Sequence, residues 1–184
     1  GSALTTAKCI FSKNRNEHLS EEKLVGQLKN IFGLKNLFIL TYGYLAGDDT
    51  DSHIDMLARF VDSTTIMYAS CENEEDEHYN ELNLMKFELT ALKAKYEYQL
   101  IDLPIGKVHD ENGNRLPASY VNFLIINNAV LVPQYNVKED VIVYNKFKIF
   151  FKKRDIIPID CSLLIKQGGS LHCATMNFYK GTFY

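Results

Sequence analysis

The densest group of potentially reactive side chains lies in residues 48–55, which read Asp-Asp-Thr-Asp-Ser-His-Ile-Asp. Four carboxylates and one imidazole share these eight residues, so like charges repel one another unless a cation or a proton-transfer task offsets the repulsion. If the segment is extended, His53 and Asp55 point to the same side, and Asp49 and Asp51 do the same. The segment therefore indicates a site that binds a cation or moves a proton.

Two simpler interpretations of this segment are a solvated acidic loop and an adventitious metal-binding turn. The chain continues with residues 56–61, Met-Leu-Ala-Arg-Phe-Val, which have the pattern of a half-buried strand. This continuation favours a functional site, because a solvated loop does not usually run straight into core. A single histidine with scattered carboxylates is a weak ligand set, so we expect no metal.

The second stretch with chemical potential is residues 167–175, Gln-Gly-Gly-Ser-Leu-His-Cys-Ala-Thr. Paired glycines let the backbone turn sharply or approach a ligand closely. A cysteine soon after such a turn is a candidate thiolate nucleophile, so we select Cys173, with His53 brought to it by the fold. In a strand His172 would face away from Cys173, which makes it the weaker candidate base. The alternative is a small buried cysteine at the head of a strand.

The combination of thiolate and carboxylates restricts the substrate. Carboxylates around a thiolate would repel it, unless the substrate itself carries a strong positive charge. A guanidinium satisfies this condition, because its planar fork of N–H donors matches carboxylates in bidentate geometry.

The composition is that of an ordinary globular chain of about one domain, with 184 residues of which 46% are hydrophobic and 23% charged. The net charge of −3 argues against nucleic acid or an anionic membrane as the main partner. No apolar run approaches the roughly 20 residues that a transmembrane helix needs. The chain opens with Gly1-Ser2, so we expect its natural start to be missing. The four cysteines lie far apart without a Cys-x-x-Cys pair, which favours a reducing, cytoplasmic location.

Hydrophobic periodicity and turn residues divide the chain into strands and helices. Strands are predicted over residues 4–11, 37–42, 57–61, 65–69, 96–103, 121–126, 129–132 and 156–159. Helices are predicted from an N-cap at Ser20 to Gly33, over 72–95, and over 137–151. The acidic run 72–77 is interpreted as a solvated helix N-terminus that complements the macrodipole.

Two hairpins, around Phe60 and Phe123, are each followed by a helix and a strand, which gives a repeated ββαβ module. Repeats of this length are typical of a propeller-like or solenoid array. The pattern starts and stops within a module, so we expect an incomplete array and hence a fragment.

Several segments resemble the agmatine deiminase family, which belongs to the guanidino-group-modifying pentein superfamily. The matching segments are residues 48–61, 115–123 (Arg-Leu-Pro-Ala-Ser-Tyr-Val-Asn-Phe), 130–134 (Val-Leu-Val-Pro-Gln) and 168–175. The resemblance implies an α/β propeller (pentein) fold of repeated ββαβ modules, here an incomplete ring. Residues 1–184 would be the C-terminal part of a single catalytic domain, without its N-terminal modules.

The resemblance also implies site residues. Cys173 would attack the guanidinium carbon of agmatine and form a covalent amidino-cysteine intermediate. His53 would protonate the departing ammonia and then activate water, Asp55 would hold the guanidinium, and Asp49 and Gly169 would line the substrate site. The product would be N-carbamoylputrescine, on the route to putrescine and other polyamines, and no cofactor is implied.

The sequence departs from the family pattern in three ways. Ser52 replaces an expected glycine, and Met176-Asn177-Phe178 replaces the polar residues expected after the nucleophile. The family's Trp-x-Arg-Asp-like block and a guanidinium-binding glutamate are also absent, with no Trp in the chain. We therefore expect little or no activity unless the missing N-terminal half or another chain completes the site. A homo-oligomer is a further possible assembly.

Three alternatives stay open. A bacterial peptidylarginine deiminase has a similar catalytic module, and a non-catalytic remnant or assembly partner would keep the modules for binding alone. A papain-like protease fits the sequence less well than these two, because an amide substrate has no positive charge for the carboxylates near His53 to bind.

Overall fold

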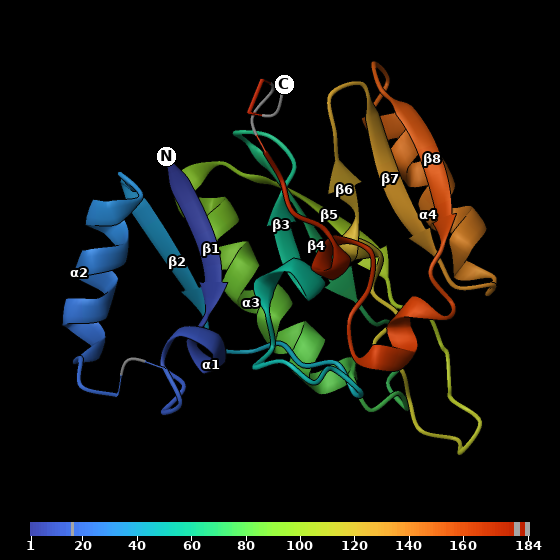
Figure 1. The fold of residues 1–184 in the computed structure, drawn as a ribbon, viewed down its shortest axis with the longest axis horizontal. Helices are drawn as coiled ribbons and strands as arrows, with labels where there is room; N and C mark the ends of the chain where they lie inside the picture. Colours follow the sequence, from blue (N-terminus) through green and yellow to red (C-terminus); the bar gives the residue numbers. More distant parts are fainter. Residues whose placement is uncertain (16, 179–180, 183–184) are drawn as a thin grey trace.

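The computed structural model describes residues 1–15, 17–178 and 181–182. Three α/β units lie side by side across the molecule, and each combines a small sheet with one long helix (Figure 1). The strand orders are β1-β2, β3-β4-β5 and β6-β7-β8. None of the helices in the described ranges is long and apolar enough to cross a lipid bilayer.

The first unit has a two-stranded parallel sheet. Its elements are β1 (Ser2–Thr6), α1 (Ala7–Ile10), α2 (Glu21–Ile31) and β2 (Asn36–Leu40). The predicted N-cap is confirmed, because the Ser20 side chain accepts a hydrogen bond from the Lys23 amide. The predicted strand over residues 4–11 is wrong at its end. The chain turns into α1 after Thr6, whose hydroxyl accepts from the Cys9 amide and thereby caps that short helix.

The second and third units are complete copies of one ββαβ module, which confirms the predicted repeat. The second contains β3 (Ala58–Phe60), β4 (Thr65–Ser70), α3 (Tyr79–Tyr96) and β5 (Gln99–Pro104). The third contains β6 (Leu124–Ile125), β7 (Ala129–Gln134), α4 (Glu139–Phe150) and β8 (Asp155–Asp160). In both, the first two strands pair antiparallel and the helix returns the third strand parallel to the second.

The described residues also form four short 3-10 helices. Two of them, η1 (Ile54–Met56) and η2 (Tyr120–Asn122), lie between the units, whereas η3 (Leu164–Gln167) and η4 (His172–Ala174) follow β8. The predicted strand over residues 121–126 is therefore wrong in its first half, where η2 precedes a β6 of two residues. Three of these turns, η1, η2 and η4, carry the side chains of the candidate site.

The acidic run 72–77 lies before α3, which starts at Tyr79, so it is not helical as predicted, although Glu72, Glu74, Glu75 and Glu77 are exposed. Asp76 differs from them: its side chain is only 8% exposed, with Oδ1 2.7 Å from His78 Nδ1 and Oδ2 3.2 Å from an Arg115 amino nitrogen. His78 Nε2 accepts from the Ala46 amide at 2.8 Å, so the ring proton lies on Nδ1, toward Asp76. The prediction fails at Asp76 because this side chain pairs with the buried guanidinium of Arg115, 39 residues away in the sequence. This network holds the chain at the start of residues 48–55.

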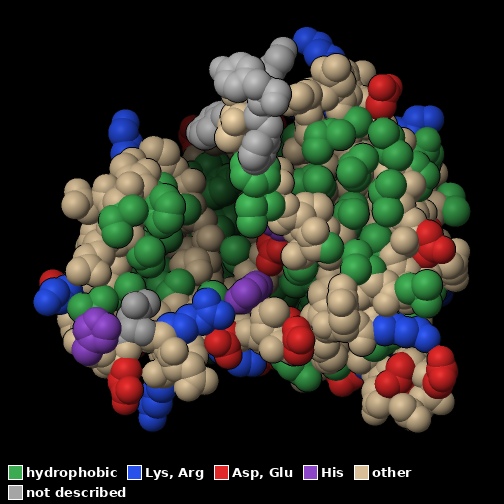
Figure 2. Space-filling model, in the orientation of Figure 1, with side chains coloured by type: hydrophobic (Ala, Val, Ile, Leu, Met, Phe, Trp, Pro, Cys, Tyr) green, Lys and Arg blue, Asp and Glu red, His purple; other side chains and the backbone are tan. Residues whose placement is uncertain are grey.

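The third unit exposes several large hydrophobic side chains. In Figure 1 α4 lies behind the β6-β7-β8 sheet, and Figure 2 shows hydrophobic side chains over the front of that unit. Ile157 on β8 is 40% exposed and Leu163, just after β8, is 81% exposed. The outer strand of the second sheet, β5, exposes only its first residue, whereas β8 exposes four of its six residues, Asp155, Ile157, Pro158 and Asp160. The third sheet therefore leaves more of its outer strand uncovered than the second does.

A buried tyrosine ties the site to the third module. The Tyr120 hydroxyl donates to Asp140 Oδ1 at 2.5 Å, and burial, followed by that carboxylate, raises the pKa of Tyr120 far above its usual range. Asp140 also accepts from the amides of Tyr135 and Val137, at the start of α4. One carboxylate thus links η2, the end of β7 and α4.

We expect Tyr120→Phe to lower the free energy of unfolding by about 1–3 kcal/mol, because it leaves a buried carboxylate short of a donor. Urea denaturation measures this loss. Tyr68→Phe is the matched control, since Tyr68 is also buried but its hydroxyl makes no hydrogen bond within the described residues. Equal losses in the two variants would contradict the assignment.

Candidate active site

The two chemically promising segments meet in one pocket of about 500 Å³. Its lining comes from residues 48–55 and from the segment that ends in η4, and comprises Asp49, Thr50, His53, Asp55, Gln167, Gly169, His172, Cys173 and Ala174. Figure 2 shows histidine and acidic side chains close together near the middle of the face in view, below a hollow with hydrophobic walls. The fold thus brings together all five residues proposed from the sequence.

Cys173 lies on η4 with its thiol reachable from the pocket. Its Sγ accepts from Asn122 Nδ2 at 3.2 Å and from the backbone amide of Ser170, and lies 3.6 Å from Asp55 Oδ2. Partial burial, together with the Asp55 charge, raises the pKa of Cys173 despite the two N–H donors. In the free site the sulfur therefore rests as a thiol at neutral pH.

Asp55 lies on η1 and receives a cluster of donors. Its Oδ2 is 2.7 Å from His172 Nδ1 and 3.1 Å from Asn122 Nδ2, in addition to the Cys173 thiol. Burial would raise the pKa of Asp55, but the hydrogen bond and charge of His172, helped by Cys173 and Arg59, outweigh burial and lower it. Asp55 is therefore held as a carboxylate inside the pocket.

His53 lines the pocket, but the backbone around it differs from the extended conformation that the sequence predicted. The segment is not extended, because Ser52 has a φ of +52° and η1 starts directly after His53. The Ser52 carbonyl accepts from the Thr6 hydroxyl at 2.8 Å, which anchors this bend to β1. The shared strand face predicted for His53 and Asp55 is therefore wrong, although both side chains line the pocket.

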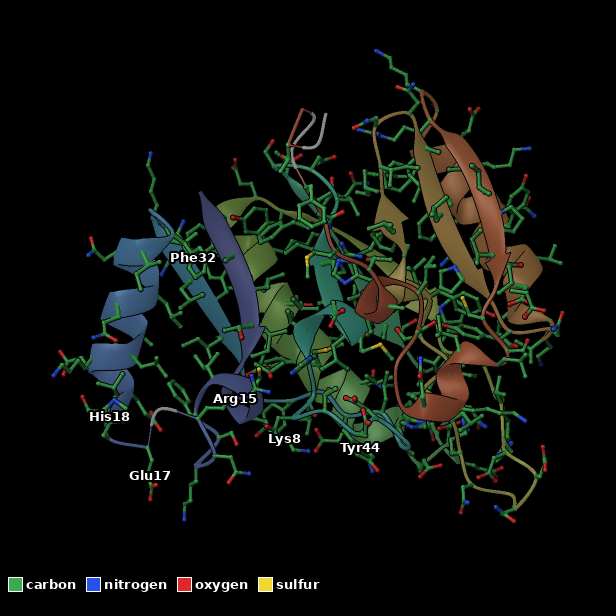
Figure 3. The ribbon with its side chains drawn as sticks, in the orientation of Figure 1. Lys8, Arg15, Glu17, His18, Phe32 and Tyr44 are labelled. Carbon is green, nitrogen blue, oxygen red and sulfur yellow. The ribbon has the colours of Figure 1, made fainter. Side chains whose placement is uncertain are left out.

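An arginine from the first unit holds His53. An Arg15 amino group lies 3.3 Å from His53 Nε2, and Arg15 Nε lies 3.7 Å from Asp51. Figure 3 shows Arg15 beside α1, on the side of the molecule where Lys8 and Tyr44 also lie. Within the described residues no hydrogen bond joins His53 to Cys173. His53 is thus tethered from outside the pocket.

Two glycines leave room for the acids and the thiol. A Cβ on Gly168, where φ is +82°, would lie 2.5 Å from Asp49 Cγ, so only glycine lets Asp49 pack there. A Cβ on Gly169 would lie 3.2 Å from the Cys173 Cβ and 3.4 Å from its Sγ. The glycine pair therefore sets the spacing between Asp49 and the candidate nucleophile.

Sequence reasoning missed Asn122 and undervalued His172. Asn122 is fully buried, and a lone amide in the apolar stretch Val121 to Leu124 was the available signal, because a buried amide needs partners. His172 was placed in a strand, whereas η4 turns its ring toward Asp55. The described residues contain no group of three or more His, Cys, Asp or Glu side chains suited to hold a metal ion.

Comparisons with known proteins identify the family of the chain. The model of the Porphyromonas-type peptidyl-arginine deiminase family matches residues 1–178, and the chain belongs to that family. An agmatine deiminase from Medicago truncatula is 28% identical over 200 residues, which cover 95% of this chain and 53% of that protein. A cysteine-to-serine variant of an agmatine deiminase from C. jejuni, solved with substrate bound, is 44% identical with a TM-score of 0.93 and covers 98% of this chain and 53% of that one.

These relatives confirm the resemblance to agmatine deiminases and the pentein type of α/β fold. The chain spans about half the length of the curated relatives that it matches.

We expect Gly168→Ala to slow the labelling of Cys173 by a haloacetamidine, a cationic guanidinium-like electrophile, because Asp49 must move away. Gly113→Ala is the matched control: its φ is +83° with open space around it, so it costs only the backbone term of about 1–2 kcal/mol. Mass spectrometry measures the rate of labelling, and urea denaturation measures the free energy of unfolding of each variant. Equal labelling rates in the two variants would show that Asp49 does not act on the pocket.

Proposed function

We propose that this protein, in its full-length form, hydrolyses the guanidinium of agmatine to N-carbamoylputrescine and ammonia. The observation that carries this proposal is the convergence of a thiol, two imidazoles and two carboxylates, including Cys173, His53, Asp55 and Asp49, on one pocket. The names of the matched relatives support agmatine as the substrate. The reaction consumes only water and needs no cofactor.

In the proposed first half-reaction, the Cys173 thiol gives its proton to His53 once the substrate is bound, and the thiolate attacks the guanidinium carbon to form a C–S bond. The protonated His53 then donates that proton as the C–N bond breaks and ammonia leaves, which gives an amidino-cysteine. In the second half, His53 accepts a proton from water as the water oxygen bonds to the same carbon. The C–S bond then breaks to return the thiolate, and the remaining hydroxyl proton passes to solvent, where the released ammonia takes it up. Asp55 and Asp49 accept N–H bonds from the guanidinium throughout.

The substrate charge activates the nucleophile in this scheme. Because burial and Asp55 raise the pKa of Cys173, few thiolates exist in the free site. A bound guanidinium places a positive charge beside both groups and favours the thiolate. The positive charge of the substrate thus offsets the negative charge of Asp55, which by itself disfavours the Cys173 thiolate.

Residues 1–184 are proposed to be the C-terminal part of one propeller-type catalytic domain. Among the described residues, no strand gives the first unit the antiparallel partner that β3 and β6 provide in the others, and the third unit exposes apolar side chains. Further modules, from an N-terminal half or from another chain such as a second copy, would cover these surfaces and supply the remaining guanidinium ligands. All four cysteines are free thiols, which suits a cytoplasmic enzyme of putrescine and polyamine biosynthesis.

A second candidate function is deimination of arginine within peptides. The description of the matched family favours it. To separate the two functions, the full-length protein is given free agmatine in one reaction and an arginine peptide with blocked ends in another. The substrate that is deiminated identifies the function.

We expect a haloacetamidine to label Cys173 faster than neutral iodoacetamide does at pH 7, because only the cationic reagent offsets Asp55. The advantage should shrink as the pH rises through the raised pKa of Cys173, where the thiolate no longer depends on the reagent's charge. Mass spectrometry identifies the modified residue, with Cys173→Ala as the control.

Agmatine should suppress this labelling, and His53→Ala should abolish ammonia release by the full-length protein. Cys71 provides the internal comparison, since its thiol is also partly buried and lies outside the pocket. If the haloacetamidine labels Cys173 of the full-length protein no faster than it labels Cys71, the proposed function is refuted.

A further inference from the structure

His172 makes a short polar contact with Asp55 in the pocket. Its Nδ1 lies 2.7 Å from Asp55 Oδ2, with the side chains of His172 and Asp55 only 26% and 19% exposed. Because Asp55 is held as a carboxylate, a hydrogen bond of this length from the ring N–H is charge-assisted. The chemistry proposed above assigns no role to His172.

The backbone of His172 is fixed on both sides. Its N–H donates to Asn122 Oδ1 at 2.8 Å, and its carbonyl accepts from the backbone amide and the hydroxyl of Thr175, at 3.0 and 2.8 Å. The residue is therefore presented to Asp55 by a rigid turn.

All donors to the Asp55 side chain converge on one oxygen. His172, Asn122 and Cys173 reach Oδ2, whereas no hydrogen bond from the described residues reaches Oδ1. A carboxylate anchored through one oxygen keeps the lone pairs of the other for a ligand. Since Asp55 lines the pocket, Oδ1 is the oxygen that remains for a substrate N–H.

We propose that His172 is a positioning residue, whose Nδ1–H anchors Asp55 Oδ2 so that Oδ1 is free to bind the guanidinium of the substrate. This inference rests on the proposed function for the identity of the substrate, but the anchoring itself does not.

Other ionisable groups also face Asp55. They are the Cys173 thiol from η4, the Arg59 guanidinium from β3, and His53 and Asp49 across the pocket. Among the groups that lower the pKa of Asp55 against burial, His172 has the largest effect, through its hydrogen bond and its charge. Loss of His172 should therefore leave Asp55 both less oriented and easier to protonate.

The first test needs no substrate. We compare His172→Leu, which removes the donor, with His172→Asn, whose side-chain amide can place an N–H near the former Nδ1. At pH 7 His172→Leu should raise the unfolding equilibrium constant about tenfold, the equivalent of one hydrogen bond, and His172→Asn should restore most of it. His18→Leu is the control, because His18 is exposed and Figure 3 places it beside the start of α2, away from η4.

The pH dependence of this difference identifies Asp55 as the partner. A carboxyl whose pKa is lowered in the folded state contributes stability that is full above its unfolded pKa, about 4, and is lost as the pH falls through the folded value. The difference in stability between wild type and His172→Leu should therefore narrow below about pH 4 and vanish in an Asp55→Ala background, which has no side-chain acceptor. A difference that persists in that background would overturn the proposal.

The second test uses the full-length protein and measures how agmatine protects Cys173 from iodoacetamide. We expect His172→Leu to weaken protection about tenfold or more, increasingly so as the pH is lowered, and His172→Asn to recover it. Equal protection in wild type and His172→Leu would overturn the role in guanidinium binding. Absence of protection in the wild type would instead overturn the proposed function, while the first test would still decide whether His172 anchors Asp55.

Discussion

The hydrogen bonds of Asn122 hold the candidate site together. Its Oδ1 accepts from the amides of His172 and Cys173, and its Nδ2 donates to Asp55 and to the Cys173 sulfur. Because Oδ1 faces two N–H donors, the amide can have only one orientation, and Nδ2 must point at the thiol and the carboxylate. One fully buried side chain thus fixes the relative positions of η1, η2 and η4.

The turn that carries Asn122 is itself held from β3. The Arg59 guanidinium stacks 4.6 Å from the centre of the Phe123 ring and donates to the carbonyls of Val121 and Phe123, on either side of Asn122. Burial lowers the pKa of Arg59, and the nearby Asp55 and Cys173 oppose that change. A partly buried cation therefore lies near Asp55 and also fixes the backbone that carries Asn122.

The sequence was sufficient to predict the repeated module and the two segments that form the pocket, because both depend on local patterns. Hydrophobic periodicity marks α2 and α4, and the acidic and glycine-rich segments have unusual composition. The bends at residues 52–56 and 172–174 are short 3-10 turns without a periodic signature, so the orientation of His53 and His172 was not predictable. The partner of Asp76 lies 39 residues away, and only the tertiary fold shows that this acid is buried.

The spacing of the Asn122 contacts along the chain has a consequence for folding. They join residues 67 and 51 positions apart, and the His172–Asp55 bond spans 117. Contacts of such separation carry a higher loop-closure entropy than local ones, so we expect them to form after the hairpins and helices of each module. Cys173 would then acquire its neighbours late, and a partly folded chain would carry it as an ordinary cysteine.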